Sequence, residues 1–436
     1  MWWGGAERLH LRPMANPPVF NLLRSEIANL PVADLVRDFG TPTYVYDKDR
    51  IVEKIADLRA FDVIRYAVKA NSNLAILDLC RRQGVLVDAV SAGEVHRAMV
   101  AGFLPGGDPP PLVYTADIFD RDSLAAVLEH GIHVNCGSPD MIDQYGEQAP
   151  GRDITLRLNP GFGHGHSLKT NTGGEHSKHG IWHEDLAECV RRAERHSLRI
   201  SGIHAHIGSG ADLEHLVQVS DAIERFARSV GPAVTMISAG GGLSVPYHPE
   251  DPEIDLEGYI RTWDASRKRL EADFGHAVRL EIEPGRYLVA ESGYLVTEIR
   301  AVKTVGKNTF YMVDAGFNNL ARPVLYGAYH PMSIVPSGEG VRGEMEVVVG
   351  GPLCESGDIF TQDLGGYVRT QRLPEAKVGE FLVIECAGAY GFTMSSNYNS
   401  RPHAAEVLVS GGKAQLVRAR QSLDDLVRGE PIPPSD

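Results

Sequence analysis

Lys69 stands where a predicted strand ends and a predicted helix begins. Residues 63–69 form a β-type run, and the Ala-Asn-Ser-Asn that follows is typical of a helix start. A lysine at the end of a buried strand costs free energy unless it is paired or used chemically. One chemical use is a Schiff base with a carbonyl cofactor such as pyridoxal phosphate. The alternative is a surface lysine, so the choice depends on the rest of the chain.

Lys69 belongs to a series of strand and helix patterns that alternate between residues 63 and 283. The predicted strands are 63–69, 85–90, 112–116, 132–136, 154–159, 200–206, 234–239 and 278–283. The clearest helical patterns between them are 74–82, 92–101, 185–196 and 213–230. Eight such units predict a (β/α)8 TIM-type barrel. A doubly wound open sheet is the alternative, but the GxGxxG turn expected after its first strand is missing.

Polar residues and glycines lie at or just after the ends of several of these strands. Because the active site of such a barrel lies at the carboxyl ends of its strands, we expect them to converge. They are Asp88, His206, Ser209, Gly241, Gly242, Glu283, Gly285 and Arg286.

Each of these positions has a functional and a structural interpretation. Glycines 240–242 allow close backbone approach to a phosphate, or form only a tight turn. His204 and His206 are expected to share one face of a strand, for stacking on a cofactor or for a metal. We predict no metal. Glu283 suits a pyridine nitrogen, and its structural alternative is an ion pair with Arg286.

The pattern changes after about residue 295. Short β-rich segments follow at 294–302, 309–314, 345–349, 380–386 and 406–410. They predict a second, all-β domain, to which 42–46 could add a strand. The predicted organisation is a ragged extension at 1–19, a segment of the β domain at 20–48, the barrel at 49–292, the β-rich domain at 293–430 and a disordered tail at 431–436.

Two motifs of the β-rich part could carry chemistry. Cys354 and Glu355 lie in a loop bounded by glycine and proline, where a thiol could donate a proton. A lone cysteine is more often a small buried hydrophobe. Tyr390 stands among small residues, which fits close approach to a ligand, with core packing as the alternative.

Composition limits the class of protein. The 436 residues predict two domains, and a net charge of −14 does not favour nucleic acid or anionic membranes as partners. No secretory signal or membrane span is predicted. The five cysteines contain no CxxC pair, which favours a reducing cytoplasm over a disulfide framework; they are Cys80, Cys136, Cys189, Cys354 and Cys386.

Six motifs together resemble the diaminopimelate decarboxylases, pyridoxal-phosphate enzymes of the alanine-racemase-like fold type. They are Tyr-Ala-Val-Lys-Ala-Asn at 66–71, His-Ile-Gly-Ser-Gly at 206–210, Gly-Gly-Gly-Leu at 240–243, Glu-Pro-Gly-Arg at 283–286, Cys-Glu-Ser-Gly-Asp at 354–358 and Gly-Ala-Tyr at 388–390. Residues 159–182 resemble the enterobacterial-type branch. The resemblance extends from about residue 20 through nearly the whole remaining chain.

The resemblance implies decarboxylation of a diamino dicarboxylate, meso-2,6-diaminopimelate, to L-lysine by a homodimer with shared sites. Lys69 would be the Schiff-base lysine, His206 would stack on the cofactor and Glu283 would meet its pyridine nitrogen. Asp88 would support the ring or its lysine. The phosphate group would be held by Ser209, Gly242, Arg286 and Tyr390, with Gly241 and Gly285 in the same turns. Substrate would be held by Arg286, Arg322, Tyr326, Glu355 and Tyr390, and the partner's Cys354 would supply a proton.

Three alternative functions can be compared with these residues. An alanine-racemase-like isomerase would be expected to have an arginine near the pyridine nitrogen and a tyrosine base, rather than Glu283 and Cys354. A non-catalytic homologue would be expected to lack Lys69 or Cys354. A related decarboxylase of another diamino acid shares all of these features.

Overall fold

The computed structural model describes residues 20–163, 171–208 and 213–434. The chain forms two compact units. The barrel unit contains the described parts of Val52–Val245 and Glu253–Leu288. The β-rich unit contains the described parts of Pro18–Ile51, Pro246–Pro252 and Val289–Asp436. The predicted extension 1–19 lies outside the described residues.

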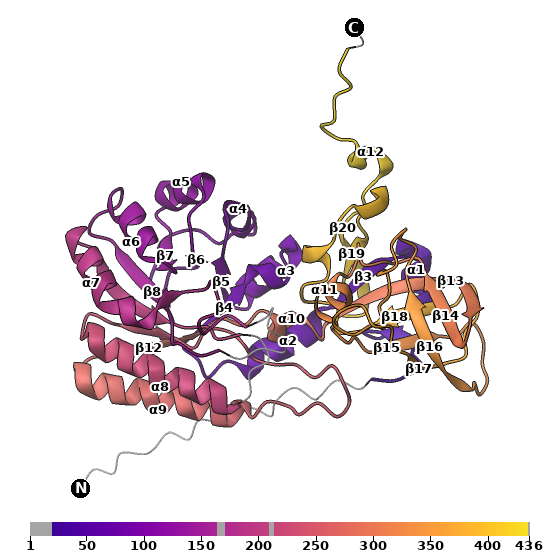
Figure 1. The fold of residues 1–436 in the computed structure, drawn as a ribbon, viewed down its shortest axis with the longest axis horizontal. Coiled ribbons are helices and arrows are strands. Elements are labelled where there is room, and N and C mark those ends of the chain that lie inside the picture. Colours follow the sequence, from indigo (N-terminus) through magenta and orange to yellow (C-terminus); the bar gives the residue numbers. More distant parts are fainter. Residues whose placement is uncertain (1–19, 164–170, 209–212, 435–436) are drawn as a thin grey trace. The chain divides into compact units, whose positions relative to one another are not determined.

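Eight parallel strands close into a barrel, because β10 pairs with β8 as well as with β11 (Figure 1). This confirms the predicted (β/α)8 fold. The barrel strands are β4 (Val63–Ala67), β5 (Leu86–Ala89), β6 (Leu112–Ala116), β7 (His133–Cys136), β8 (Asp153–Asn159), β10 (Arg199–His204), β11 (Met236–Ser238) and β12 (Arg279–Ile282). The short β9 (Ile181–Trp182) pairs with β8.

Helices alternate with these strands, and several begin at a side chain that caps the first turn. Asn73, Ser91, Asp120 and Ser138 each accept a hydrogen bond from a backbone N–H of that turn. The helices are α2 (Lys48–Asp57), α3 (Leu74–Arg82), α4 (Ala92–Val100), α5 (Arg121–His130), α6 (Pro139–Gly146), α7 (Leu186–Arg195), α8 (Leu213–Val230), α9 (Leu256–Phe274) and α10 (Arg286–Val289).

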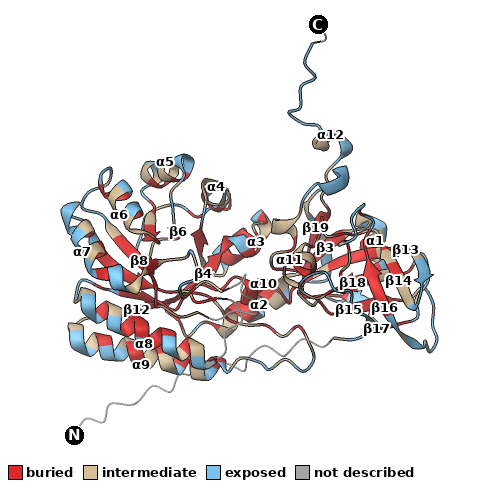
Figure 2. Ribbon diagram, viewed as in Figure 1, coloured by how far each residue is buried: buried red, intermediate tan, exposed pale blue. Residues whose placement is uncertain are grey.

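Alternation along β8 shows how a strand serves two environments. Ile154, Leu156 and Leu158 occupy one face, and Thr155, Arg157 and Asn159 occupy the other. All six are buried. The strands of this unit are mostly buried, while its helices expose one side to solvent (Figure 2).

The β-rich unit contains a nine-stranded sheet, confirming the predicted second domain. β3 (Thr43–Asp47) lies between β13 and β19, so the predicted N-terminal strand is also confirmed. The other strands are β13 (Gly293–Val305), β14 (Asn308–Val313), β15 (Met332–Val335), β16 (Glu344–Gly350), β17 (Gln371–Pro374), β18 (Phe381–Ile384), β19 (Ala405–Ser410) and β20 (Lys413–Arg418).

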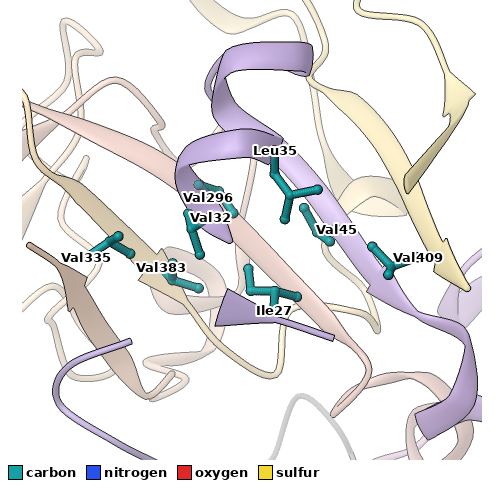
Figure 3. Close-up of a cluster of buried hydrophobic side chains, with 8 residues drawn as sticks. All are labelled: Ile27, Val32, Leu35, Val45, Val296, Val335, Val383 and Val409. Atoms are coloured by element: carbon teal, nitrogen blue, oxygen red, sulfur yellow. The ribbon is translucent and has the colours of Figure 1, made fainter. Parts of the chain in front are cut away.

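A buried apolar cluster anchors the N-terminal segment to this sheet (Figure 3). The helix α1 (Val32–Phe39) contributes Val32 and Leu35, and β1 (Glu26–Ile27), which pairs with β2 (Leu30–Pro31), contributes Ile27. The sheet and its neighbouring strands contribute Val45, Val296, Val335, Val383 and Val409. Two short helices complete the unit, α11 (Arg322–Tyr326) and α12 (Leu423–Leu426). Within the described ranges, no helix has the length and apolar character needed to cross a membrane.

Candidate active site

Lys69 lies just beyond the carboxyl end of a barrel strand. The strand β4 ends at Ala67, and Lys69 occupies the 3-10 turn Val68–Ala70, so the predicted strand is two residues too long. The backbone N–H of Ala67 donates to the carbonyl of Pro284, which joins this end of β4 to the turn after β12. Lys69 is exposed while Val68 and Ala70 are buried. The expected cost of burying the amine therefore does not arise.

His206 is fixed in one protonation state by its neighbour. The backbone N–H of Gly241 donates to Nδ1 of His206 at 3.0 Å, so Nδ1 carries no proton. Burial, followed by the charges of Lys69 and Arg157, lowers the pKa of His206 well below its usual value. The ring is therefore neutral, with its proton on Nε2.

The expected placing of His204 and His206 on one strand face is wrong. β10 ends at His204, and His206 follows two residues later in the loop. His204 is buried instead against Glu283, with Nε2 2.7 Å from Oε2.

Glu283 is a buried carboxylate with a partner for each oxygen. His204 binds Oε2, and the hydroxyl of Ser238 donates to Oε1 at 3.1 Å. Burial raises the pKa of Glu283, but the charge and hydrogen bond of His204 outweigh it, and the pKa lies at about 2. Glu283 is therefore ionised at neutral pH, and these two contacts fix its orientation.

Asp88 has the opposite character. Burial and the nearby charge of Glu283 raise the pKa of Asp88 well above its usual value, against a hydrogen bond from Thr115 and the charge of Lys69. The hydroxyl of Thr115 in turn accepts from Nδ2 of Asn135 at 2.7 Å. The buried Oδ1 of Asp88 has no hydrogen-bond partner among the described residues. A buried oxygen of this kind fits a polar group supplied by a ligand.

The glycines at 240–242 form a cradle that a side chain would fill. Gly240 and Gly242 have φ of +60° and +110°. A Cβ at Gly241 would lie 2.6 Å from the carbonyl oxygen of Glu283, and one at Gly242 would lie 2.6 Å from that of Gly208. This close backbone approach fits a bound phosphate group. Ser209, predicted to join the phosphate site, lies outside the described residues.

Two further predicted residues, Gly285 and Arg286, follow β12 in the turn into α10. Arg286 is buried and begins that helix. The structure therefore brings eight predicted site residues, including Lys69 and Glu283, to the carboxyl ends of the barrel strands or to the segments that follow them. The other six are Asp88, His206, Gly241, Gly242, Gly285 and Arg286.

In the β-rich unit, Cys354 and Glu355 lie on an exposed loop. The backbone N–H of Cys354 donates to Oδ1 of Asn399 at 2.7 Å. Asp358 anchors the loop by accepting from the N–H groups of Leu353 and Phe317. The alternative of a buried Cys354 is therefore wrong.

Arg322 and Tyr326 lie four residues apart on α11, so they share one face of that helix. Arg322 is buried and Tyr326 is half-buried. Tyr390 is half-buried and has a φ of 57°, a conformation that few non-glycine residues adopt. Such a backbone indicates a local constraint at Tyr390.

Sequence patterns do not identify the residues that contact Glu283 and support Asp88. Ser238, Thr115 and Asn135 are small polar residues near strand ends, and only that position could have drawn attention to them.

A different pocket, of about 490 Å³, lies at the opposite end of the barrel. Its lining includes the first residues of several strands, such as Asp153, Arg199 and Arg279. Arg199 pairs with Asp153, and Arg279 pairs with Glu281. These paired charges at the amino end of the strands fit a role in stability rather than catalysis. No cluster of three or more potential metal-ligating side chains occurs in the described part of the chain.

Comparison with known proteins finds a family match and close relatives. The family described as "Pyridoxal-dependent decarboxylase, pyridoxal binding domain" matches residues 49–290. The diaminopimelate decarboxylase of Streptomyces coelicolor is 53% identical over 401 residues, covering 92% of this chain and 91% of the relative. A crystal structure of a diaminopimelate decarboxylase has 52% identity and a TM-score of 0.88, covering 91% of this chain and 95% of its own. The Helicobacter pylori enzyme complexed with L-lysine has 31% identity and a TM-score of 0.82, covering 91% and 98%.

Proposed function

The chain belongs to the pyridoxal-dependent decarboxylases and, within them, to the diaminopimelate decarboxylases, and from this membership we propose roles for its residues. The enzyme removes the D-centre carboxylate of meso-2,6-diaminopimelate as carbon dioxide and leaves L-lysine, the last step of lysine biosynthesis. We assign cofactor binding to the barrel domain, predicted as 49–292, and the second domain to 293–430; within the first range, 49–51, 246–252 and 289–292 belong to the β-rich unit of the structure.

The carboxyl end of the barrel fits pyridoxal phosphate, which supplies an electron sink for the electrons released with carbon dioxide. The glycine cradle and the unpartnered Oδ1 of Asp88 are the observations that support this fit. Lys69 would hold the cofactor covalently, and the neutral ring of His206 would stack on its ring. The phosphate would be held by Ser209, Gly241, Gly242, Gly285, Arg286 and Tyr390.

The observation that carries the proposal is the fixed, ionised carboxylate of Glu283. A carboxylate that stays charged can keep a pyridine nitrogen protonated, which maintains the electron sink. Its contacts with His204 and Ser238 hold Glu283 in place before any ligand arrives. Asp88 supports the cofactor ring or Lys69.

Substrate recognition is proposed for Arg286, Arg322, Tyr326, Glu355 and Tyr390. The two arginines and Tyr326 bind carboxylate, and an arginine suits a carboxylate that must be retained. Glu355 binds the distal ammonium group from its exposed loop. L-lysine and ornithine have one carboxylate instead of two, so they leave some of these groups unpaired.

A comparison of substrates tests this assignment. Purified protein loaded with pyridoxal phosphate should turn over meso-diaminopimelate, with L-lysine and ornithine poorer by roughly four orders of magnitude. Comparable turnover of L-lysine and meso-diaminopimelate would reject the assigned substrate.

We further propose a cytoplasmic homodimer in which the partner subunit's Cys354 supplies the proton to the carbon that has lost carbon dioxide. The five free cysteines and the exposed Cys354 loop support this proposal. Mixing inactive Lys69→Ala with inactive Cys354→Ala should restore part of the activity, because a mixed dimer contains one intact site. If the subunits exchange and no activity returns, the sites are not shared.

A further inference from the structure

Arg322 donates a hydrogen bond to a buried histidine. Its Nη1 lies 2.8 Å from Nε2 of His330, and Nδ1 of His330 lies 2.9 Å from the carbonyl oxygen of Glu385. A guanidinium only donates and a carbonyl only accepts. His330 is therefore neutral, with its proton on Nδ1 and a lone pair on Nε2 that faces Arg322.

The same guanidinium packs on an aromatic ring. Its central carbon lies 5.0 Å from the ring centroid of Tyr247. The rings of Tyr247 and His330 meet edge to face, with centroids 5.5 Å apart at 82°. Arg322 thus contacts a hydrogen-bond acceptor and a ring face, and all three side chains are buried.

Tyr247 and His330 are themselves fixed by their surroundings within the β-rich unit. The carboxylate of Asp251 accepts the backbone N–H groups of Tyr247 and His248 at 2.8 Å. The rings of His248 and Tyr329 stack with centroids 3.8 Å apart. These contacts attach the segment 246–252 to residues 329–330, although the segment is remote from them in sequence.

We propose that His330 and Tyr247 are positioning residues that orient the guanidinium of Arg322 for the carboxylate retained in the product. An arginine side chain has many rotamers, and a bidentate grip on carboxylate requires a fixed plane. The acceptor on His330 and the face of Tyr247 define that plane before substrate binds, which lowers the ordering cost of binding. This inference rests on the proposed role of Arg322 in substrate recognition.

Three variants of the holoenzyme separate positioning from packing. His330→Gln keeps an acceptor near the position of Nε2, His330→Asn keeps only a donor near Nδ1, and His330→Phe keeps the ring volume alone. The KM for meso-diaminopimelate should rise about tenfold to a hundredfold for Asn and Phe, as expected for a hydrogen bond to a charged group, and less for Gln. The kcat should change less than threefold in all three. Tyr247→Leu, which removes the ring face, should also raise KM.

The decisive readout is inhibition by two ligands that differ by one carboxylate. L-lysine and 1,5-diaminopentane are tested as competitors of meso-diaminopimelate. His330→Asn should weaken L-lysine about tenfold or more and leave the diamine unchanged, whereas general damage to the site would weaken both equally. Equal weakening, or no change in KM for His330→Asn and His330→Phe, would overturn the inference.

Arg322→Ala separates this inference from its premise. If Arg322→Ala also weakens inhibition by L-lysine and by the diamine equally, the proposed role of Arg322 is wrong. If Arg322→Ala weakens only inhibition by L-lysine and the His330 variants do not, only the positioning role is wrong. The visible absorbance of the bound cofactor and the Tm show that each variant is folded and loaded.

Discussion

The backbone N–H of Gly241 lies 3.0 Å from Nδ1 of His206 and donates a hydrogen bond to it. The same glycine leaves no room for a side chain, because a Cβ would lie 2.6 Å from the carbonyl oxygen of Glu283 and 3.2 Å from Cε1 of His206. One residue therefore sets the tautomer of the proposed stacking ring and keeps the neighbouring backbone close.

Gly241→Ala should impair cofactor binding. The new methyl group must push the backbone of Glu283 or the ring of His206 away, at a cost of about 1–3 kcal/mol. We expect a lower Tm and at least tenfold weaker binding of pyridoxal phosphate, measured by titration of cofactor into apoenzyme. Gly338→Ala is the control, since a Cβ there meets nothing within 4 Å. Unchanged cofactor affinity in Gly241→Ala would contradict the proposed cradle.

Lys69 should carry the cofactor covalently. Borohydride reduction of the holoenzyme should fix the pyridoxal group on Lys69, as peptide mapping can show. Lys69→Ala should lose this label and nearly all activity, yet remain folded, because an exposed amine rather than core volume is removed. Lys307→Ala, another exposed lysine, should keep both. A label on another lysine would refute the assignment.

The barrel could be predicted from the sequence because its strands are buried apolar runs separated by amphipathic helices. The prediction was less accurate at strand ends. These two strands end at Ala67 and His204, two residues before their predicted ends, because pairing within the barrel decides where a strand stops. The sequence alone could not assign the segment 246–252 to the β-rich unit, because no local pattern indicates its ring contacts with Tyr329 and His330.

Site residues that carry reactive or charged groups could be named from motifs, but their supporting residues could not. Ser238 holds Glu283, and His330 holds Arg322. Both depend on contacts between residues 45 and 8 positions apart, respectively, which no spacing rule singles out. The sequence also could not show that Cys354 is exposed, because exposure depends on the packing of the whole unit.

Glu283→Gln should lower kcat by about two to three orders of magnitude, because an amide cannot keep the pyridine nitrogen protonated while its shape is nearly the same. Glu281→Gln is a matched control two residues earlier on β12. Glu281 is also buried but pairs with Arg65, so its variant should lose stability and keep its kcat once folded. The measurement is kcat at saturating meso-diaminopimelate, together with Tm. Similar kcat values for the two variants would remove the special role of Glu283.

Glu380 should make the stability of the β-rich unit depend on pH in the acid range. Its carboxylate accepts from both terminal nitrogens of Arg342 and from the N–H groups of Ser337 and Lys377. Arg342 is the largest cause that lowers the pKa of Glu380 from 4.5 to about 2.

Because this pKa is lower in the folded state, the unfolded chain takes up more protons as the pH falls from about 4.5 to about 2, and stability is lost over that range. Glu380→Gln should lower the free energy of unfolding by about 1–3 kcal/mol at pH 7. Its stability should also decline less steeply in acid, because a neutral amide takes up no proton over this pH range. Urea unfolding between pH 7 and pH 3 measures both effects. Glu346→Gln, at an exposed position on β16, should follow the unaltered protein at every pH. Parallel curves for Glu380→Gln and the unaltered protein would show that Glu380 does not control this acid transition.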